Sequence, residues 1–80
     1  MISSEQLRAA RALLRWEQKD LAEASGVSLP SLKRLETQPG PLAAHARTVE
    51  AIVKAFEGAG ILFLSDGETS DGGPGVRMGK

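Results

Sequence analysis

The chain has 80 residues, with ten Lys and Arg balanced by ten Asp and Glu, one His and no Cys. A chain of this length holds one small core, and the lack of cysteine excludes disulfide frameworks, thiolate metal sites and thiol nucleophiles. A formal net charge of zero argues against an indiscriminate nucleic-acid binder, because such proteins neutralise phosphates with many Lys and Arg. We expect a soluble, cytoplasmic protein, since no apolar run approaches the roughly 18 residues of a membrane span and the first residues do not resemble a signal peptide.

Glycine placement divides the chain into two parts. Seven of the nine glycines lie from Gly58 onward. Residues 1–58 are therefore expected to form a helical domain. Residues 59–80 are expected to form a C-terminal β-hairpin or dimerisation tail, with a mobile Gly-rich loop over residues 66–75.

The first helix should begin after Ser3, because Ser3 and Gln6 have the spacing of a capping box. Apolar residues then recur at helical intervals, at Leu7, Ala10 and Leu14. Leu13 and Trp16 are expected to help close the end of this helix. A second helix over residues 18–25 should end at Gly26, because glycine tolerates a left-handed backbone.

A third helix is expected to start after Ser28, a good N-cap, with Pro30 in its first turn. The Pro- and Gly-containing segment 38–41 must end it. A fourth helix finishing near Gly58 has the clearest periodicity of the chain, with apolar residues at Val49, Ile52, Val53 and Phe56.

Two short strands are predicted in the C-terminal part. Residues 61–64 form an apolar run between turn signals, and residues 76–78 are a weaker strand candidate. An isolated two-stranded hairpin is marginal in water, so these strands should pack on the helices or pair with the edge of a second chain, and we expect both.

The second and third helices are joined in the manner of a helix-turn-helix, with a small Ala22, a turn at Gly26 and Val27 beneath it. The pattern Gln18-x-x-Leu21-Ala22-x-x-x-Gly26-Val27-Ser28-x-x-x-Leu32-x-x-Leu35-Glu36 resembles the Cro/repressor (XRE-type) helix-turn-helix family of DNA-binding regulators. The resemblance covers residues 7 to about 57. It implies a mainly α fold, a compact four-to-five-helix bundle with a helix-turn-helix, to which this chain adds its short C-terminal β-hairpin.

The resemblance also implies that helix 28–37 enters the major groove of double-stranded DNA. The implied DNA-binding residues are Gln18, Ser28, Leu29, Pro30, Ser31, Lys33, Arg34, Thr37, Gln38 and Arg47. Arg34 is the main candidate for base readout, because its planar fork matches guanine O6 and N7, and its alternative is a solvated helix charge. Leu29 and Pro30 depart from the family's polar norm, so they either touch a thymine methyl or only start the helix.

Further roles implied by the resemblance are structural. Arg11 and Glu36 occupy positions where the family often has a partly buried ion pair, while Ala22 and Gly26 shape the turn. Removing one partner of such a pair costs about 3–5 kcal/mol if it is buried and much less if it is exposed. The sequence leaves both possibilities open.

Other polar residues are weak candidates. Arg47, with Lys54 and Arg8, supplies either phosphate contacts or plain surface charge. His45 has no second His or Cys at ligand spacing, so we expect an exposed residue and no metal. The carboxylate pairs 20 and 23, and 66 and 68, lie in polar segments, and the run 72–75 lacks a phosphate-loop context, so no catalytic residue and no cofactor is expected.

The resulting hypothesis is a sequence-specific transcriptional regulator that binds double-stranded DNA as a homodimer. Its two reading helices would lie roughly 34 Å apart, and strand 61–64 is the candidate interface between the copies. The alternative is a protein-binding module on the same fold, such as an antitoxin or adaptor, which the neutral charge and the apolar Leu29 and Pro30 favour. Such a module would tolerate the loss of Lys33 and Arg34.

Overall fold

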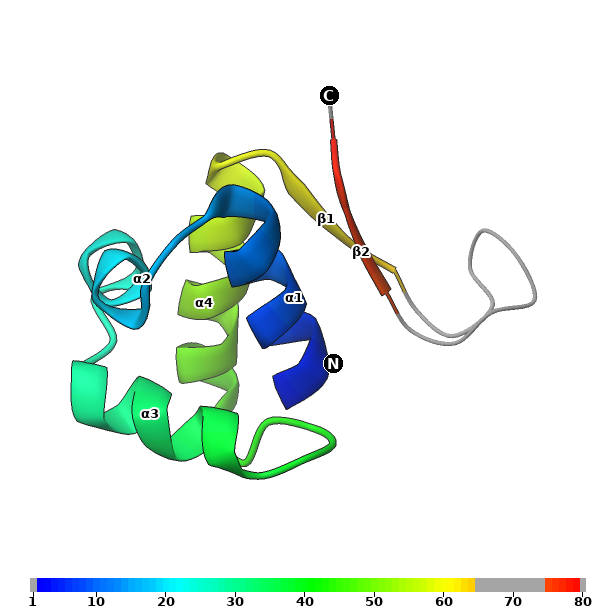
Figure 1. Ribbon diagram of the computed structural model, residues 1–80. Coiled ribbons are helices and arrows are strands. Elements are labelled where there is room, and N and C mark those ends of the chain that lie inside the picture. The colour runs from blue at the N-terminus through cyan, green and yellow to red at the C-terminus, as the bar shows by residue number, and fades with distance from the viewer. Residues whose placement is uncertain (1, 65–74, 80) are drawn as a thin grey trace.

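Four helices precede two strands in the computed structural model, which describes residues 2–64 and 75–79 (Figure 1). The elements are α1 (Ser4–Leu14), α2 (Gln18–Ser25), α3 (Leu29–Thr37), α4 (Ala46–Gly58), β1 (Ile61–Leu64) and β2 (Gly75–Met78). The expectation of a mainly helical chain that ends in a short antiparallel hairpin is confirmed. Most of the predicted Gly-rich loop lies outside the described residues, and its last position, Gly75, begins β2.

The helix ends follow the local sequence. The amide of Gln6 donates to Ser3 Oγ at 3.1 Å, and the Ser3 amide donates to Gln6 Oε1 at 2.9 Å, which is the predicted capping box of α1. α2 lacks a Ser, Thr or Asp at its N-cap, but the Glu17 amide donates to Asp20 Oδ2 at 2.7 Å, so a residue within the helix satisfies this group. Gly26 ends α2 with a φ of 77°, the left-handed conformation expected there.

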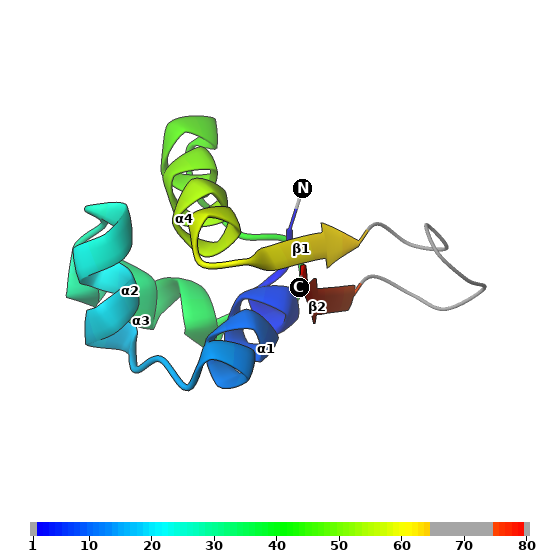
Figure 2. The same ribbon diagram turned by 90° about the horizontal axis from the view of Figure 1, so that it is seen from above.

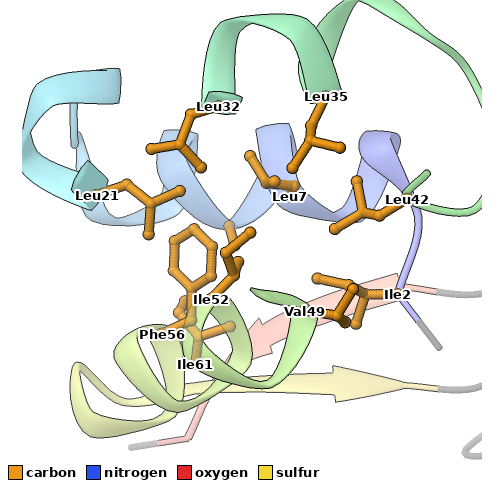
Figure 3. Packing of buried hydrophobic residues seen from close by; sticks show 11 residues of the cluster. Ile2, Leu7, Leu21, Leu32, Leu35, Leu42, Val49, Ile52, Phe56 and Ile61 are labelled. Carbon is orange, nitrogen blue, oxygen red and sulfur yellow. The ribbon is translucent and has the colours of Figure 1, made fainter. Parts of the chain in front are cut away.

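The core surrounds α4. Figure 3 shows Phe56 and Ile52 of α4 facing Leu7 of α1, Leu21 of α2 and Leu32 of α3. Eleven buried apolar residues make up this cluster: Ile2, Leu7, Ala10, Leu21, Leu32, Leu35, Leu42, Val49, Ile52, Phe56 and Ile61. All four helices and β1 contribute to it, so α3 and the hairpin rest on one common core.

Aromatic stacking connects the ends of that core. The ring of Trp16, in the α1–α2 link, stacks on Phe56 with centroids 5.6 Å apart. Phe63 of β1 meets the same Phe56 ring edge-on at 5.7 Å. Both geometries are favourable for aromatic pairs and add to the burial of apolar area. The three aromatic residues of the chain therefore form one row from the first link to the hairpin.

The prediction for the end of α1 was right for Trp16 and wrong for Leu13. The Leu13 side chain is 45% exposed. Successive residues of a helix are rotated by about 100°, so Leu13 lies on the stripe of Gln6 and Ala9 rather than on that of Leu7 and Leu14. The hairpin covers Gln6 at the start of this stripe, whereas Ala9 and Leu13 are exposed. A bulky apolar residue thus remains at the surface.

An ion pair joins α1 to α3. Arg11 Nε donates to Glu36 Oε2 at 2.8 Å, and a terminal guanidinium nitrogen donates to Glu36 Oε1 at 2.7 Å. The other terminal nitrogen of Arg11 donates to the Trp16 carbonyl at 2.9 Å. The side chains of Arg11 and Glu36 are only 20% and 6% exposed, so the pair that the sequence left undecided is largely buried.

The hairpin lies against α1 and α4, with β2 beside α1 and β1 beside α4 (Figure 2). Ile61 pairs with Met78, and Leu64 with Gly75. The buried Gln6 side chain donates to the carbonyl of Leu64 at 3.1 Å and to that of Gly75 at 3.0 Å. One side chain of α1 therefore binds both strands at the end of the hairpin where β1 finishes and β2 begins. None of the described helices has the length and apolar character needed to cross a bilayer.

Candidate nucleic-acid interface

α3 is held firmly on one side and is free on the other. Leu32 and Leu35 are buried in the core, and Glu36 is fixed by Arg11. Ser28 Oγ accepts the amide of Ser31 at 3.3 Å and so caps the helix, as predicted. The opposite face is solvent-exposed and consists of Pro30, Lys33, Arg34 and Thr37. The helix can thus present these side chains without losing its anchorage.

A short turn with Gly26 in the left-handed conformation separates α2 from α3. Ala22 and Val27 are partly buried against the core on either side of Gly26. The Val27 amide donates to Ser25 Oγ at 3.1 Å, which satisfies a backbone group between the two helices. This turn fixes where α3 begins relative to α2.

A groove with a volume of about 770 Å³ lies between this turn, α3 and the start of α4. We call it the α3–α4 groove. Its lining residues are Ser25, Gly26, Val27, Ser28, Ser31, Arg34, Leu35, Ala43, Ala44, His45, Arg47, Thr48 and Ala51. The groove brings together four of the residues predicted to bind DNA, namely Ser28, Ser31, Arg34 and Arg47. The exposed Arg34 links it to the outer face of α3.

The charge of the α3–α4 groove is one-sided. Arg34, His45 and Arg47 line it, and none of its lining residues is a carboxylate. His45 is the N-cap of α4, but its side chain makes no capping hydrogen bond and is exposed. The groove can therefore attract an anion although the whole chain is formally neutral.

Two hydroxyl groups at or near the groove already donate hydrogen bonds within the protein. Ser28 Oγ donates to Ser31 Oγ at 2.8 Å, and Thr37 Oγ1 donates to the Arg34 carbonyl at 2.7 Å. Since phosphate oxygens accept hydrogen bonds, the hydroxyls of Ser28 and Thr37 would have to leave these partners before they could donate to DNA. The Ser31 hydroxyl, which accepts the bond from Ser28, and the cationic side chains are available to a phosphate without such a rearrangement.

The remaining predicted DNA-binding residues lie outside the groove. Leu29 is partly buried at the start of α3, and the exposed Pro30 follows it. Lys33 is rotated by about 100° from Arg34 around the helix, toward the side away from the groove. Gln18 begins α2, and the exposed Gln38 follows the last residue of α3.

Two further basic residues considered from the sequence are elsewhere. Lys54 lies about two turns along α4 from Arg47 and borders a separate, largely apolar hollow with Val49 and Val53. Arg8 lies 3.8 Å from Glu5 in an exposed ion pair. Neither residue contributes to the α3–α4 groove.

The carboxylate of Glu5 has a perturbed pKa and lies away from the groove. The pKa of Glu5 is lowered by hydrogen bonds from its own backbone amide and from the Gly40 amide, with a smaller effect of Arg8. The Gly40 amide lies 3.0 and 3.3 Å from the two carboxylate oxygens. Glu5 thus ties the start of α1 to the α3–α4 connection.

The acidic residues considered from the sequence lie apart from the α3–α4 groove or outside the described residues. The described part of the chain contains no group of three or more His, Asp or Glu side chains that could hold a metal ion. Asp20 is occupied with the amide of Glu17. The second carboxylate pair and most of the Gly-rich run lie outside the described residues.

His45 is the member of the groove that sequence reasoning missed. The available signal was the charge pattern, because no Asp or Glu occurs between Glu36 and Glu50 while His45 and Arg47 do. No protein-family model matches the chain, and no curated protein is significantly similar to it. Its function must therefore be argued from the geometry and the sequence pattern.

Proposed function

We propose that the chain is a sequence-specific transcriptional regulator of the Cro/repressor-like type, which acts in the cytoplasm and binds double-stranded DNA. In this proposal α2 and α3 form the helix-turn-helix, and α3 enters the major groove. The observation that carries the proposal is the placement of Arg34. It projects from the free face of an anchored helix, beside a groove that is lined by cations and by no carboxylate.

The individual contacts follow from side-chain chemistry. Arg34 donates two parallel hydrogen bonds to guanine O6 and N7, a contact worth about 1–3 kcal/mol of discrimination. Lys33, a point charge on a flexible stem, binds phosphate, as does Arg47 at the start of α4. Leu29 and Pro30 offer only apolar contact, which suits a thymine methyl group.

A homodimer supplies the affinity that net charge does not. One neutral module with a few phosphate contacts binds DNA weakly. Two linked modules bind DNA more tightly, although neither module makes a new contact. β1 offers an edge for pairing, because the Gly79 amide donates to the Gly60 carbonyl and the alternating ladder then directs the backbone groups of Ile61 and Phe63 away from β2. Their side chains pack on the chain's own helices, and Leu62 remains 40% exposed.

The dimer is tested by sedimentation of the wild-type chain and of Leu62→Lys. An exposed charge on strand β1 should disfavour edge pairing and lower the dimer fraction, while the thermal unfolding of the monomer changes little. Equal sedimentation of both proteins as monomers would exclude a dimer through this strand.

In-vitro selection of bound duplexes from a random DNA pool, at near-physiological salt, tests DNA recognition. We expect an inverted repeat with half-sites spaced by about one helical turn. Arg34→Ala should relax the preference at one position of each half-site, and Lys33→Ala should weaken binding to all sequences. Lys54→Ala, which removes a cation about two turns along α4 from Arg47 and outside the α3–α4 groove, is the matched control and should select the same repeat.

A protein-binding module on the same fold is the second candidate. It is favoured by the large apolar side chains left exposed, since Leu13, Leu62 and Met78 are all at least 40% exposed. If the folded chain enriches no duplex, sequence-specific DNA binding by the chain alone is excluded. Binding to a protein partner that survives the double substitution of Lys33 and Arg34 by Ala would then support this candidate.

A further inference from the structure

His45 has an exposed side chain that lies in the cationic α3–α4 groove. It is the sole imidazole of the chain, and it lines the α3–α4 groove with Arg34 and Arg47. It caps α4 through its backbone, while its side chain makes no capping hydrogen bond. An imidazole that does no structural work beside two guanidinium groups is available to a ligand of the same chemistry as theirs.

We propose that His45 is a further contact to the DNA backbone and that it takes up a proton when a phosphate enters the α3–α4 groove. DNA affinity then rises as the pH falls through the range in which imidazole titrates. This inference rests on the proposed function and adds a regulatory property to it.

The surroundings of His45 leave phosphate as its anionic partner. Arg34 of α3 and Arg47 of α4 are the charged groups that share the groove with it. Among the carboxylates on the neighbouring helices, Glu36 is bound to Arg11, Glu50 borders the apolar hollow of α4, and Glu23 is exposed on α2 outside the groove. None of these three lines the groove in the described chain.

Proton uptake by His45 is coupled thermodynamically to the binding of phosphate. A phosphate beside an imidazole favours the charged form, because the anion stabilises the imidazolium and accepts its N–H. If the complex binds more protons than the free protein does, the binding constant must rise as the pH falls. For one coupled proton the steepest dependence is about tenfold in Kd per pH unit.

The effect can be measured by fluorescence anisotropy of a labelled duplex, at constant ionic strength, between about pH 5.5 and about pH 8. The wild-type chain should bind more tightly at the lower pH. His45→Gln should remove most of this dependence, and so should His45→Asn, whose side chain is a better helix N-cap and guards against loss of folding. Lys54→Gln, outside the α3–α4 groove, should retain the wild-type dependence.

A second readout uses the fact that the chain has one histidine. Its C2 proton gives one imidazole resonance, and titration of that resonance should report a higher pKa with the duplex than without it. An unchanged titration, or a His45→Gln variant with the wild-type pH dependence, would overturn the inference while leaving DNA binding intact. If the folded chain binds no duplex at any pH, the proposed function fails, and this inference fails with it.

Discussion

The two ends of the molecule expose different kinds of surface. At the α3 end, four exposed cationic or ionisable side chains gather, namely Lys33, Arg34, His45 and Arg47. The hairpin end instead exposes apolar side chains such as Leu62 and Met78. The difference teaches that a formal net charge of zero describes the sum and not the surface, because a neutral chain can still present one cationic face to a polyanion.

Both ends depend on the same core, yet each is attached in its own way. α3 is tied to α1 by the buried Arg11–Glu36 pair, and the hairpin is tied to α1 by Gln6. Substitutions at these attachments should therefore affect one end more than the other. This separation is what the following predictions test.

Arg11→Ala should have the largest effect. It strands the buried carboxylate of Glu36, so we expect a loss of about 3–5 kcal/mol in the free energy of unfolding. Urea denaturation measures it, with Arg8→Ala as the control from the exposed pair on the same helix, where we expect less than about 1 kcal/mol. If the two variants are equally stable, the Arg11 pair contributes no more than a surface pair. The double variant Arg11→Met, Glu36→Leu should recover most of the loss, because it leaves no unpaired charge.

Gln6→Ala should loosen the hairpin end. It removes the Gln6 donor to the carbonyls of Leu64 and Gly75 and also the acceptor of the Ser3 amide in the capping box of α1, which together we expect to cost about 2 kcal/mol. Amide hydrogen exchange should show faster exchange in β1 and β2, whereas the amides of α3 keep their relative protection. Gln38→Ala, at an exposed position, is the control. Uniform loss of protection across both ends would show that the hairpin is not attached separately.

Ser28→Ala acts at the α3 end with a smaller effect. Loss of the N-cap should destabilise the chain by about 1 kcal/mol, and Ser28→Gly should cost only a few tenths. Thermal unfolding distinguishes the two variants. Equal stability of Ser28→Ala and the wild type would mean that the cap does not hold the start of α3.

The smallest effect concerns pH and Glu5. Its folded pKa is below the ordinary value, so its contribution to stability is present above the unfolded pKa and is lost as the pH falls through the folded pKa. The stability difference between wild type and Glu5→Gln should therefore be constant at neutral pH and shrink below about pH 4.5. Urea denaturation at several pH values measures it. A Glu5→Gln difference that does not change with pH would contradict the prediction.

Local sequence signals predicted the local structure well. Capping residues and apolar periodicity gave α1, α2, α3 and α4 close to their observed ends, because these signals act within one or two turns. Leu13 shows where periodicity misleads. Its type suggested the core, but Leu13 lies about two turns beyond Gln6 on the same stripe of α1, and it remains exposed although the hairpin covers Gln6.

The contacts between segments that are distant in the sequence were harder to predict from the sequence. Gln6 was recognised as a capping residue, yet its amide also reaches strands more than 50 residues away in the sequence. Within the candidate interface, the positions on α3 follow from the helix itself, whereas His45 joins the α3–α4 groove only because α4 folds back beside the turn. The sequence also could not decide how deeply the Arg11–Glu36 pair is buried, since burial depends on all the neighbouring elements.

The Gln6 contacts have a consequence for engineering. They fix the last pair of the hairpin, Leu64 and Gly75, to α1. The geometry of the helices therefore does not depend on how many residues connect these two positions. Each doubling of a flexible connection costs only about 0.6 kcal/mol in closure entropy. Foreign sequence, such as an epitope or a fluorophore-binding peptide, can therefore be inserted between Leu64 and Gly75 with α3 left in place.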